Sequence, residues 1–316
     1  KRVFFSTLLA SALTLSAVSL TAQTNTEKFN PIPTAVPSLA IAPDARGGGM
    51  GDAGVATAPD VYSQYWNPAK YAFAPNKAGA GVSFTPWLSS IVDDIYLAYG
   101  VGYYKIGSND NQALSASFRY FSIGDVHLTA NDGQQFANFS PNELAFDISY
   151  SRKLTQTFSL AATLRFIRSD YNAPTENENG GSADNTFAAD IAGYNESYIN
   201  IGQSESLLSF GFNLTNIGGK LSNNDGISEN FLPANMRIGA SLMYPVSSVS
   251  TLSFSLDINK PLVPTPPMRG ADESDSDWQK RVDDYNSTSG IAGVFKSFGS
   301  EDGGFSEKLK EITYSA

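Results

Sequence analysis

The chain has 316 residues, a formal net charge of −10, no cysteine and a single histidine. The net negative charge argues against a nucleic-acid-binding protein, because phosphate contacts require clustered Lys and Arg side chains. The absence of cysteine excludes disulfides, thiolate metal sites and cysteine nucleophiles. Any Ser-His-Asp triad would have to use His127, the only imidazole. Aromatic residues make up 12% of the chain and are spread along it, which argues against disorder.

The first 22 residues have the pattern of a secretory signal peptide. Lys1 and Arg2 form a basic start, an apolar run follows to Leu20, and small residues precede Gln23. We expect cleavage after Ala22, with no cysteine available for a lipid anchor. No later stretch approaches the roughly 20 apolar residues of a membrane helix, so an exported membrane protein of this sequence would have to be a β-barrel.

Apolar and polar residues alternate with period two over most of the chain, which indicates strands with one apolar face. The alternation is clearest at 114–120, 144–150, 158–166, 208–214, 236–244 and 252–258, and weaker at 79–88, 94–105, 186–194 and 289–298. These ten segments predict an all-β, outer-membrane antiparallel β-barrel at residues 79–316, with apolar side chains toward lipid and polar ones toward a lumen. In segment 94–105 the bulky residues are expected to face lipid. A soluble β-sandwich would show the same alternation, but the signal peptide and strand lengths near ten residues favour the barrel.

The connections between these strands alternate in length. With a periplasmic N-terminus, turns after even-numbered strands should be short and loops after odd-numbered strands long. The expected short connections are residues 106–111, 154–156, 195–205 and 245–250. The expected long ones are residues 125–142, 170–185, 217–234 and 261–287, with helix content at 275–285. Only the first outer connection, near residues 89–92, is too short for this rule.

Residues 23–78 contain seven prolines and no sustained period, so they cannot form barrel wall. They are expected to form a periplasmic tail or a plug folded into the lumen. Gly49, Gly51 and Gly54 satisfy the dinucleotide pattern G-x-G-x-x-G, but no strand precedes them, so tight backbone packing is the better interpretation.

Several motifs along the chain resemble those of a known family. Asp44-Ala45-Arg46 leading into Gly49–Gly54, followed by Tyr65-Trp66-Asn67-Pro68-Ala69, resembles the N-terminal signature of FadL-like outer-membrane proteins from Bacteroidetes. Leu214–Lys220 and Leu256–Pro267 narrow the resemblance to the PorV family, also called LptO, of the type IX secretion system. The resemblance covers essentially the whole mature chain.

The resemblance implies a 14-stranded barrel with residues 23–78 as a hatch inside it, of which about ten strands are visible here. The C-terminal strands are therefore expected to be missing from this sequence, which ends in a short amphipathic turn at 305–316. The hatch residues singled out by the motifs are Asp44, Arg46, Gly49, Gly51, Asn67 and Pro68.

The resemblance also implies a non-enzymatic carrier without a cofactor. Its expected partners are the SprA/Sov translocon, secreted cargo with a C-terminal signal domain, the PorU, PorZ and PorQ attachment complex, and outer-membrane lipid. Two alternatives stay open: a FadL-like transporter of hydrophobic small molecules and a lipopolysaccharide or lipid A O-deacylase. No residues of the sequence point to the deacylase, because no nucleophile-elbow pattern accompanies His127.

Two further groups of residues are candidates for function. Arginines at expected lumen positions oppose carboxylates and predict a polar network that holds the hatch; the network is Arg119, Asp147, Arg165, Asp190, Arg237 and Asp257, with Arg168 also assigned to the lumen. The acidic segment 270–287 follows a proline-rich strut and predicts a partner-facing loop; its candidates are Pro264, Pro266, Pro267, Asp275 and Trp278. A calcium-ordered loop is the weaker alternative, since the D-x-D spacing lacks the glycine and terminal glutamate of an EF-hand.

Overall fold

A computed structural model of the protein describes residues 30–87, 94–107, 109–175, 181–222, 229–270, 272–299 and 311–316. The chain divides into two units, residues 1–31 and residues 32–316, and every helix and strand of the described residues lies in the second. The signal-peptide prediction for residues 1–22 lies outside the described residues.

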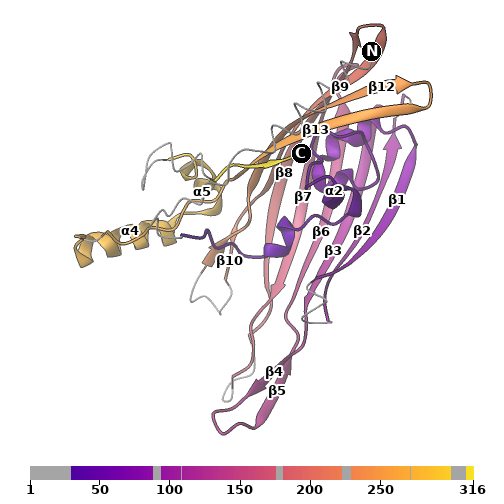
Figure 1. Ribbon diagram of the computed structural model, residues 1–316. Coiled ribbons are helices and arrows are strands. Elements are labelled where there is room, and N and C mark those ends of the chain that lie inside the picture. Colours follow the sequence, from indigo (N-terminus) through magenta and orange to yellow (C-terminus); the bar gives the residue numbers. More distant parts are fainter. Residues whose placement is uncertain are drawn as a thin grey trace, which may run out of the picture. The chain divides into compact units, whose positions relative to one another are not determined.

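The second unit is built on one antiparallel sheet of ten strands, each paired with its neighbour along the chain (Figure 1). In order, the strands are β1 (Ala78–Pro86), β2 (Ile95–Ile106), β3 (Gln112–Ile123), β6 (Asn142–Lys153), β7 (Phe158–Asp170), β8 (Asp184–Ile201), β9 (Ser204–Gly218), β12 (Asn235–Ser247), β13 (Ser250–Pro261) and β14 (Thr313–Ser315). The all-β antiparallel fold class is therefore confirmed. Within the described residues β1 and β14 form the two edges, and no pairing joins them into a closed barrel.

Connection lengths alternate as predicted. Short connections at one end of the sheet comprise residues 107–111, 154–157, 202–203 and 248–249. Long ones at the other end comprise residues 124–141, 171–183, 219–234 and 262–312. Two of these carry small hairpins, β4 (Val126–Thr129) with β5 (Gln135–Phe139) and β10 (Lys220–Ser222) with β11 (Glu229–Phe231).

One boundary prediction was wrong. The connection expected at 195–205 is only a tight turn at 202–203, because backbone pairing carries β8 and β9 beyond their apolar stretch. Gly202 takes a left-handed φ of 65° in that turn.

The strand expected at 289–298 is helix α5 (Gly290–Lys296), which follows the predicted helix α4 (Asp275–Ser287). The Ser289 side chain caps α5 by accepting a hydrogen bond from the Ala292 N–H at 3.3 Å. Val294 packs against an apolar cluster around Phe231. The short apolar run at 289–298 is therefore compatible with the spacing of a helix as well as with the period of a strand. The tenth strand is β14, in the segment where a turn was expected.

The two faces of the sheet differ in exposure as the alternation predicted. Large apolar side chains on one face are exposed, including Leu164 at 73% and Phe210 at 52%. Their polar sequence neighbours on the opposite face are buried, for example Thr163 at 2% exposure. The bulky residues of β2 are an exception, because Leu97, Tyr99 and Tyr103 lie on the buried face.

The predicted face of β2 was therefore wrong. Tyr103 stacks on Tyr71 with ring centroids 4.5 Å apart, so the bulky side of β2 fills space beside the N-terminal segment. On the adjacent strand β1, Gly79 and Gly81 leave room for Val61. Alternation shows that a strand has two faces but does not show which one another segment will cover.

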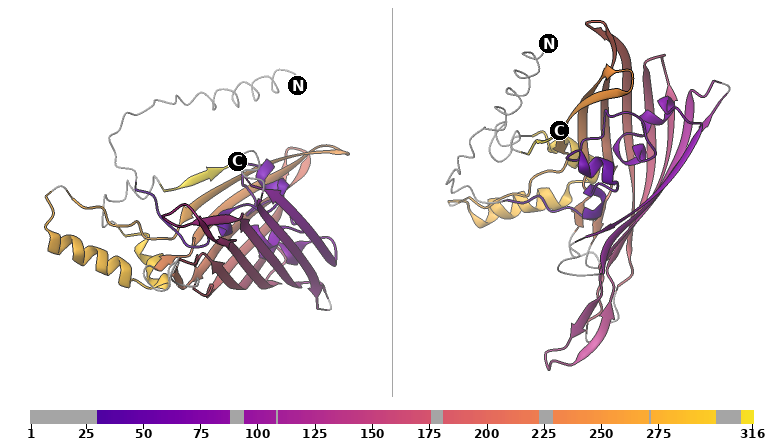
Figure 2. Two further views of the ribbon diagram at one scale, coloured as in Figure 1. Left: turned by 90° about the horizontal axis from the view of Figure 1, so that it is seen from below. Right: turned by 45° about the vertical axis from the view of Figure 1, so that its right-hand side comes forward.

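Residues 32–77, hereafter the hatch segment, lie against the buried face of this curved sheet (Figure 2). Their short helices are η1 (Pro37–Ala40), α2 (Ala45–Gly49), α3 (Ser63–Trp66) and η2 (Pro68–Phe73). The sequence explains two of these helix starts: the side chains of Asp44 and Asn67 cap α2 and η2, and Pro68 occupies the first position of η2. No helix among the described residues is long and apolar enough to cross a membrane.

The close approach of the hatch segment to the sheet yields a paired test. A Cβ atom on Gly211 would lie 2.9 Å from the Val55 carbonyl carbon and 3.0 Å from Asn67 Nδ2, whereas a Cβ on Gly100 would meet no atom within 4 Å. Gly211→Ala should therefore destabilise the fold by roughly 1–3 kcal/mol through overpacking. Gly100→Ala should not. Thermal unfolding in detergent checks this, and equal midpoints for the two variants would show that the contact is not tight.

Candidate functional site

The glycine-rich motif of the hatch segment folds around Trp66. Asp44 caps α2, since its Oδ2 accepts a hydrogen bond from the Gly47 N–H at 2.7 Å, and its Oδ1 accepts one from Trp66 Nε1 at 2.7 Å. Gly47 and Gly54 both contact the indole so closely that a Cβ would clash with it. The tight packing expected of the motif thus occurs at Gly47 and Gly54, while Gly49 faces open space.

The remaining motif residues stabilise the backbone of the hatch segment. Gly51 takes a left-handed φ of 64° in the turn after α2. Arg46 forms an ion pair with Asp60 and donates a hydrogen bond to the Ala58 carbonyl at 3.4 Å. Both ion-pair side chains are partly exposed, so this pair contributes little net stability.

Asn67 joins the hatch segment to the sheet. The side chain is fully buried, and its Nδ2 donates to the carbonyl oxygens of Val55 and Gly193, each at 2.9 Å. Its Oδ1 accepts from the Ala69 N–H at 3.1 Å, so both ends of the amide are paired. A buried amide with all these bonds fixes one arrangement of hatch and sheet, because any shift would leave polar groups unpaired.

Further side chains of the sheet form hydrogen bonds with the hatch segment. Gln64 Nε2 donates to Ser149 Oγ at 2.6 Å, and its Oε1 accepts from Ser115 Oγ at 2.7 Å. Ser159 Oγ donates to the Ala69 carbonyl at 2.8 Å, and Asn213 Nδ2 donates to the Trp66 carbonyl at 2.9 Å. Small polar residues on the inner face therefore act as hydrogen-bond partners for the hatch segment.

Asp257 and Lys70 hold the loop at Gly54 from two sides. Asp257 Oδ2 accepts the backbone N–H groups of Gly54 and Val55 at 2.7 and 2.9 Å. Lys70 Nζ donates to the Gly54 carbonyl at 2.8 Å and to Thr57 Oγ1 at 3.1 Å. Lys70 is fully buried, and this burial lowers the pKa of its ammonium group to about 8. Sequence reasoning missed Lys70, since nothing distinguishes it from a surface lysine.

The predicted polar network exists only in part. Arg165 Nε lies 2.6 Å from Asp147 Oδ1, its Nη2 lies 2.9 Å from Asp190 Oδ2, and all three side chains are buried. Asp190 Oδ1 also accepts the Asn216 N–H at 2.7 Å. A doubly paired guanidinium of this kind would leave two buried carboxylates uncompensated if it were removed.

The other arginines are placed differently. Arg119 and Arg237 form no ion pair among the described residues, and Asp257 bonds the hatch backbone instead. The lumen assignment of Arg168 was wrong: it is exposed and pairs in register with Leu144 and Asn185 on the outer face. Arg165 and Arg168 are three residues apart, so in a strand they must point to opposite faces.

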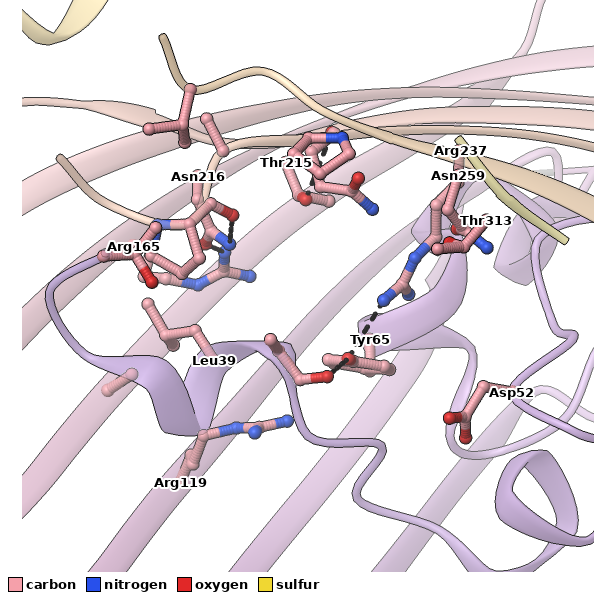
Figure 3. Close-up of a pocket in the computed structure, with 18 of the residues that line it drawn as sticks. Leu39, Asp52, Tyr65, Arg119, Arg165, Thr215, Asn216, Arg237, Asn259 and Thr313 are labelled. Carbon is pink, nitrogen blue, oxygen red and sulfur yellow. Dashed lines mark hydrogen bonds between the residues drawn. The ribbon is translucent and has the colours of Figure 1, made fainter. Parts of the chain in front are cut away.

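A cavity of about 330 Å³ lies between the hatch segment and the sheet (Figure 3). Arg119 and Arg237 both face the ring of Tyr65, with guanidinium carbons 5.1 and 4.9 Å from its centroid. Arg237 Nη2 donates to the Tyr65 hydroxyl at 3.1 Å, and Arg119 Nη1 donates to the Ile41 carbonyl at 3.0 Å. The cavity is thus polar on the side of these arginines.

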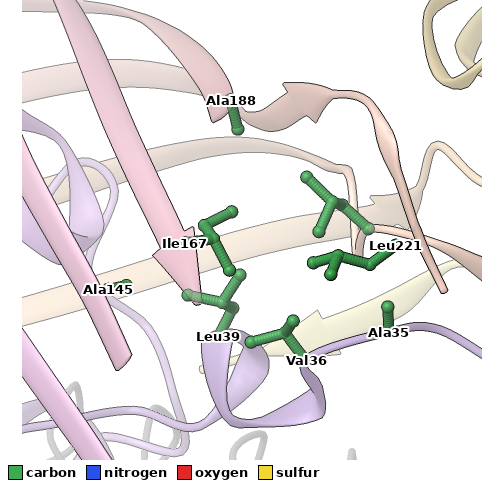
Figure 4. Close-up of a cluster of buried hydrophobic side chains, with 8 residues drawn as sticks. Ala35, Val36, Leu39, Ala145, Ile167, Ala188 and Leu221 are labelled. Carbon is green, nitrogen blue, oxygen red and sulfur yellow. The ribbon is translucent and has the colours of Figure 1, made fainter. Parts of the chain in front are cut away.

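An apolar cluster closes the other side of this region (Figure 4). Leu39 and Val36 of the hatch segment pack there against Ile167 and Leu221. Nearby, Glu143 Oε2 accepts the Ser38 N–H at 3.0 Å, which fixes the start of η1. Sequence reasoning missed Glu143, although its position on the inward face of β6 follows from the alternation.

The predicted partner-facing residues lie at the end of the sheet with long connections. Pro264 is buried beside α5, and Pro266 and Pro267 are half-buried, so the proline strut is packed rather than free. Asp275 at the start of α4 is exposed. Trp278 is partly exposed, and the guanidinium carbon of Arg281 lies 5.7 Å from the centroid of its ring. A second cavity, of about 530 Å³, separates the strut from α4 and α5.

His127 lies on the exposed β4–β5 hairpin, where its Nδ1 is 2.7 Å from Asn138 Oδ1. No group of three His, Asp or Glu side chains in the described ranges could hold a metal ion.

The Asp257 contact yields a prediction on hatch stability. Asp257→Asn removes the charge that accepts two backbone N–H groups, which should cost roughly 1–2 kcal/mol and loosen residues 44–57. Limited proteolysis of the folded protein should then cleave this region faster. Asp132→Asn, on the exposed β4–β5 turn, makes the same chemical change without this contact and serves as the control. Equal cleavage rates for the two variants would contradict the prediction.

Comparison with known proteins gives the family. No curated protein matches the chain at a significant level. The model of the family described as "Type IX secretion system protein PorV" matches residues 23–268, which include the hatch segment, strands β1 to β13 and the proline strut. The match spans well over half of the sequence, so the chain belongs to the PorV family of type IX secretion system proteins.

Proposed function

We propose that the protein is an outer-membrane component of the type IX secretion system that binds secreted cargo. In this proposal it receives the C-terminal signal domains of cargo at the SprA/Sov translocon and carries them to the attachment complex of PorU, PorZ and PorQ. The family match over residues 23–268 is the observation that carries the proposal. The named partners are those implied by the PorV-like motifs at residues 214–220 and 256–267.

The exposed apolar face of the sheet supports an outer-membrane location. Side chains such as Phe146, Leu164 and Phe187 are exposed on this face, at 42%, 73% and 71%. An extensive apolar surface with buried polar groups behind it suits lipid better than water. Residues 1–22, with the pattern of a cleavable signal peptide, are consistent with export.

The bonding of the hatch segment favours a carrier over an open conduit. Buried side chains from β3, β6, β7, β9 and β13 and a backbone carbonyl of β8 form hydrogen bonds with this segment, so much of the polar face of the sheet is already occupied. Opening a passage there would break many buried hydrogen bonds at once. Partner contacts are therefore expected outside the sheet, without a catalytic step.

Helix α4 is our candidate for such a contact. None of its residues is buried, yet it is held in place from several sides. Arg281 Nη2 lies 2.8 Å from Glu273 Oε2, Lys296 Nζ lies 2.6 Å from Asp284 Oδ2, and Tyr285 packs edge-on against Phe231. A fixed and solvent-exposed helix with a partly exposed tryptophan resembles the anchor sites of protein interfaces.

The partner role of α4 can be tested without removing the helix. The double variant Trp278→Ala/Asp283→Lys changes exposed side chains and spares Arg281 and Tyr285, which anchor the helix. Pull-downs of tagged protein should retain roughly tenfold less translocon or signal-domain cargo, because truncating an aromatic anchor typically costs over 1 kcal/mol. The variant Asp132→Lys on the β4–β5 hairpin is the charge-matched control.

Deleting the gene separates the proposal from its alternatives. Loss of many secreted surface proteins is expected here. Selective loss of uptake of hydrophobic small molecules would favour a transporter, and altered lipid A acylation alone would favour a deacylase. Wild-type protein that retains neither a SprA-like translocon nor signal-domain cargo would overturn the proposal.

The outer-membrane location gives a second test. Phe146→Arg places a charge on the exposed apolar face and should cost roughly 2–4 kcal/mol if the site lies near the bilayer midplane. Heat-modifiable migration on gels and recovery in the outer-membrane fraction measure assembly, with Phe146→Leu as the control. Normal assembly of Phe146→Arg would show that this face does not contact lipid.

A further inference from the structure

Two arginine side chains in the cavity between the hatch segment and the sheet form no ion pair with a carboxylate of the described residues. Arg119 and Arg237 stack on Tyr65, and neither forms an ion pair with any described residue, whereas Arg165 is paired with two aspartates. Arg119 is 4% exposed, so its charge is screened little by bulk water. Two cations on one ring repel each other, and an anion bound to both would relieve this repulsion.

Hydrogen-bonding groups on the cavity wall are also left over. Arg237 Nε is buried without a partner, and so is Oδ1 of Asn259, the residue directly opposite it on β13. Both residues line the cavity (Figure 3). In the described hydrogen bonds, Arg119 uses only its Nη1 atom, so further donors of its guanidinium are available. Buried groups of this kind normally have partners. The Arg237 donor therefore marks a place for an acceptor such as an oxyanion, whereas the Asn259 acceptor needs a donor such as water.

The size and lining of the cavity narrow the choice of ligand. A volume of about 330 Å³ exceeds that of a single water molecule, which occupies about 30 Å³ in the liquid. Leu39, Ala234 and Val263 line the cavity as well and offer an apolar surface. Asp52 and Asp147 also line it, but Asp147 is paired with Arg165, and neither carboxylate forms an ion pair with Arg119 or Arg237 among the described contacts.

We propose that this cavity binds a small amphipathic anion. Its carboxylate or phosphate group accepts hydrogen bonds from Arg119 and Arg237, and its apolar part contacts Leu39, Ala234 and Val263. Guanidinium groups recognise both oxyanions through paired N–H donors. The proposal is independent of the secretion role, because it rests on the cavity and not on α4 or the long connections.

Calorimetric titration of the full chain in a non-ionic detergent tests the proposal. The probes are benzoate, phenyl phosphate and the neutral analogue benzyl alcohol. We expect one or both anions to bind and the alcohol to bind at least about tenfold more weakly, because it lacks the charge-assisted hydrogen bonds. The stronger of the two anions identifies the preferred oxyanion. Equal binding of the alcohol, or no binding of either anion, would overturn the proposal.

Arginine variants locate the site. Arg237→Gln should weaken anion binding by roughly tenfold or more, while Arg168→Gln, the same change on the outer face, should leave it unaltered. Unaltered affinity in Arg237→Gln would overturn the assignment. Should Arg237→Gln fail to fold, as judged by heat-modifiable migration, Arg237→Lys keeps the charge but loses the Nε donor. In that variant an affinity equal to wild type would likewise overturn the assignment.

Discussion

Each buried polar group needs a hydrogen-bond partner, and this constraint explains how the hatch segment and the sheet fit together. The sheet exposes its apolar side chains and turns serine, threonine, asparagine and aspartate to the other face. Those groups would be costly if they were buried without partners. The hatch segment supplies them, mainly through backbone groups: its carbonyls accept from Ser159 and Asn213, and its N–H groups donate to Asp257. Irregular backbone is well suited to this, because its own groups are not used up in helices or ladders.

The sequence was sufficient to predict the sheet, since the period-two alternation and the connection lengths identify nine of its strands and their order. It was also sufficient for the two ion pairs of Arg165. The alternation places Arg165, Asp147 and Asp190 on the inward face of three adjacent strands, where they can meet. It could not identify the inward face of β2, which depends on Tyr71 packing from a distant segment. Nor could it separate helix from strand at 289–298, where a short apolar run satisfies both periods.

The candidate site was harder to predict than the fold for a related reason. Motif reading found Asp44 and Asn67, whose bonds are partly local, but it missed Lys70 and Glu143. Those two side chains act on partners that only the three-dimensional arrangement brings near. The same holds for Arg119 and Arg237: their charges suggested pairing with aspartates, yet Tyr65 and the hatch backbone occupy their guanidinium groups. Composition predicts that charges will be compensated but does not identify the partner.

The bond between Asp257 and the backbone of Gly54 has a consequence for the order of folding. Its two ends are separated by 203 positions in the chain, and one of them lies in the last long strand of the sheet. The hatch segment is synthesised before the sheet, but it cannot complete its contacts until β13 is in place. Contacts between such distant parts of a chain form slowly, because a long loop must close before they contribute. Docking of the N-terminal segment is therefore a late event in assembly, and until then the polar face of the growing sheet must stay hydrated.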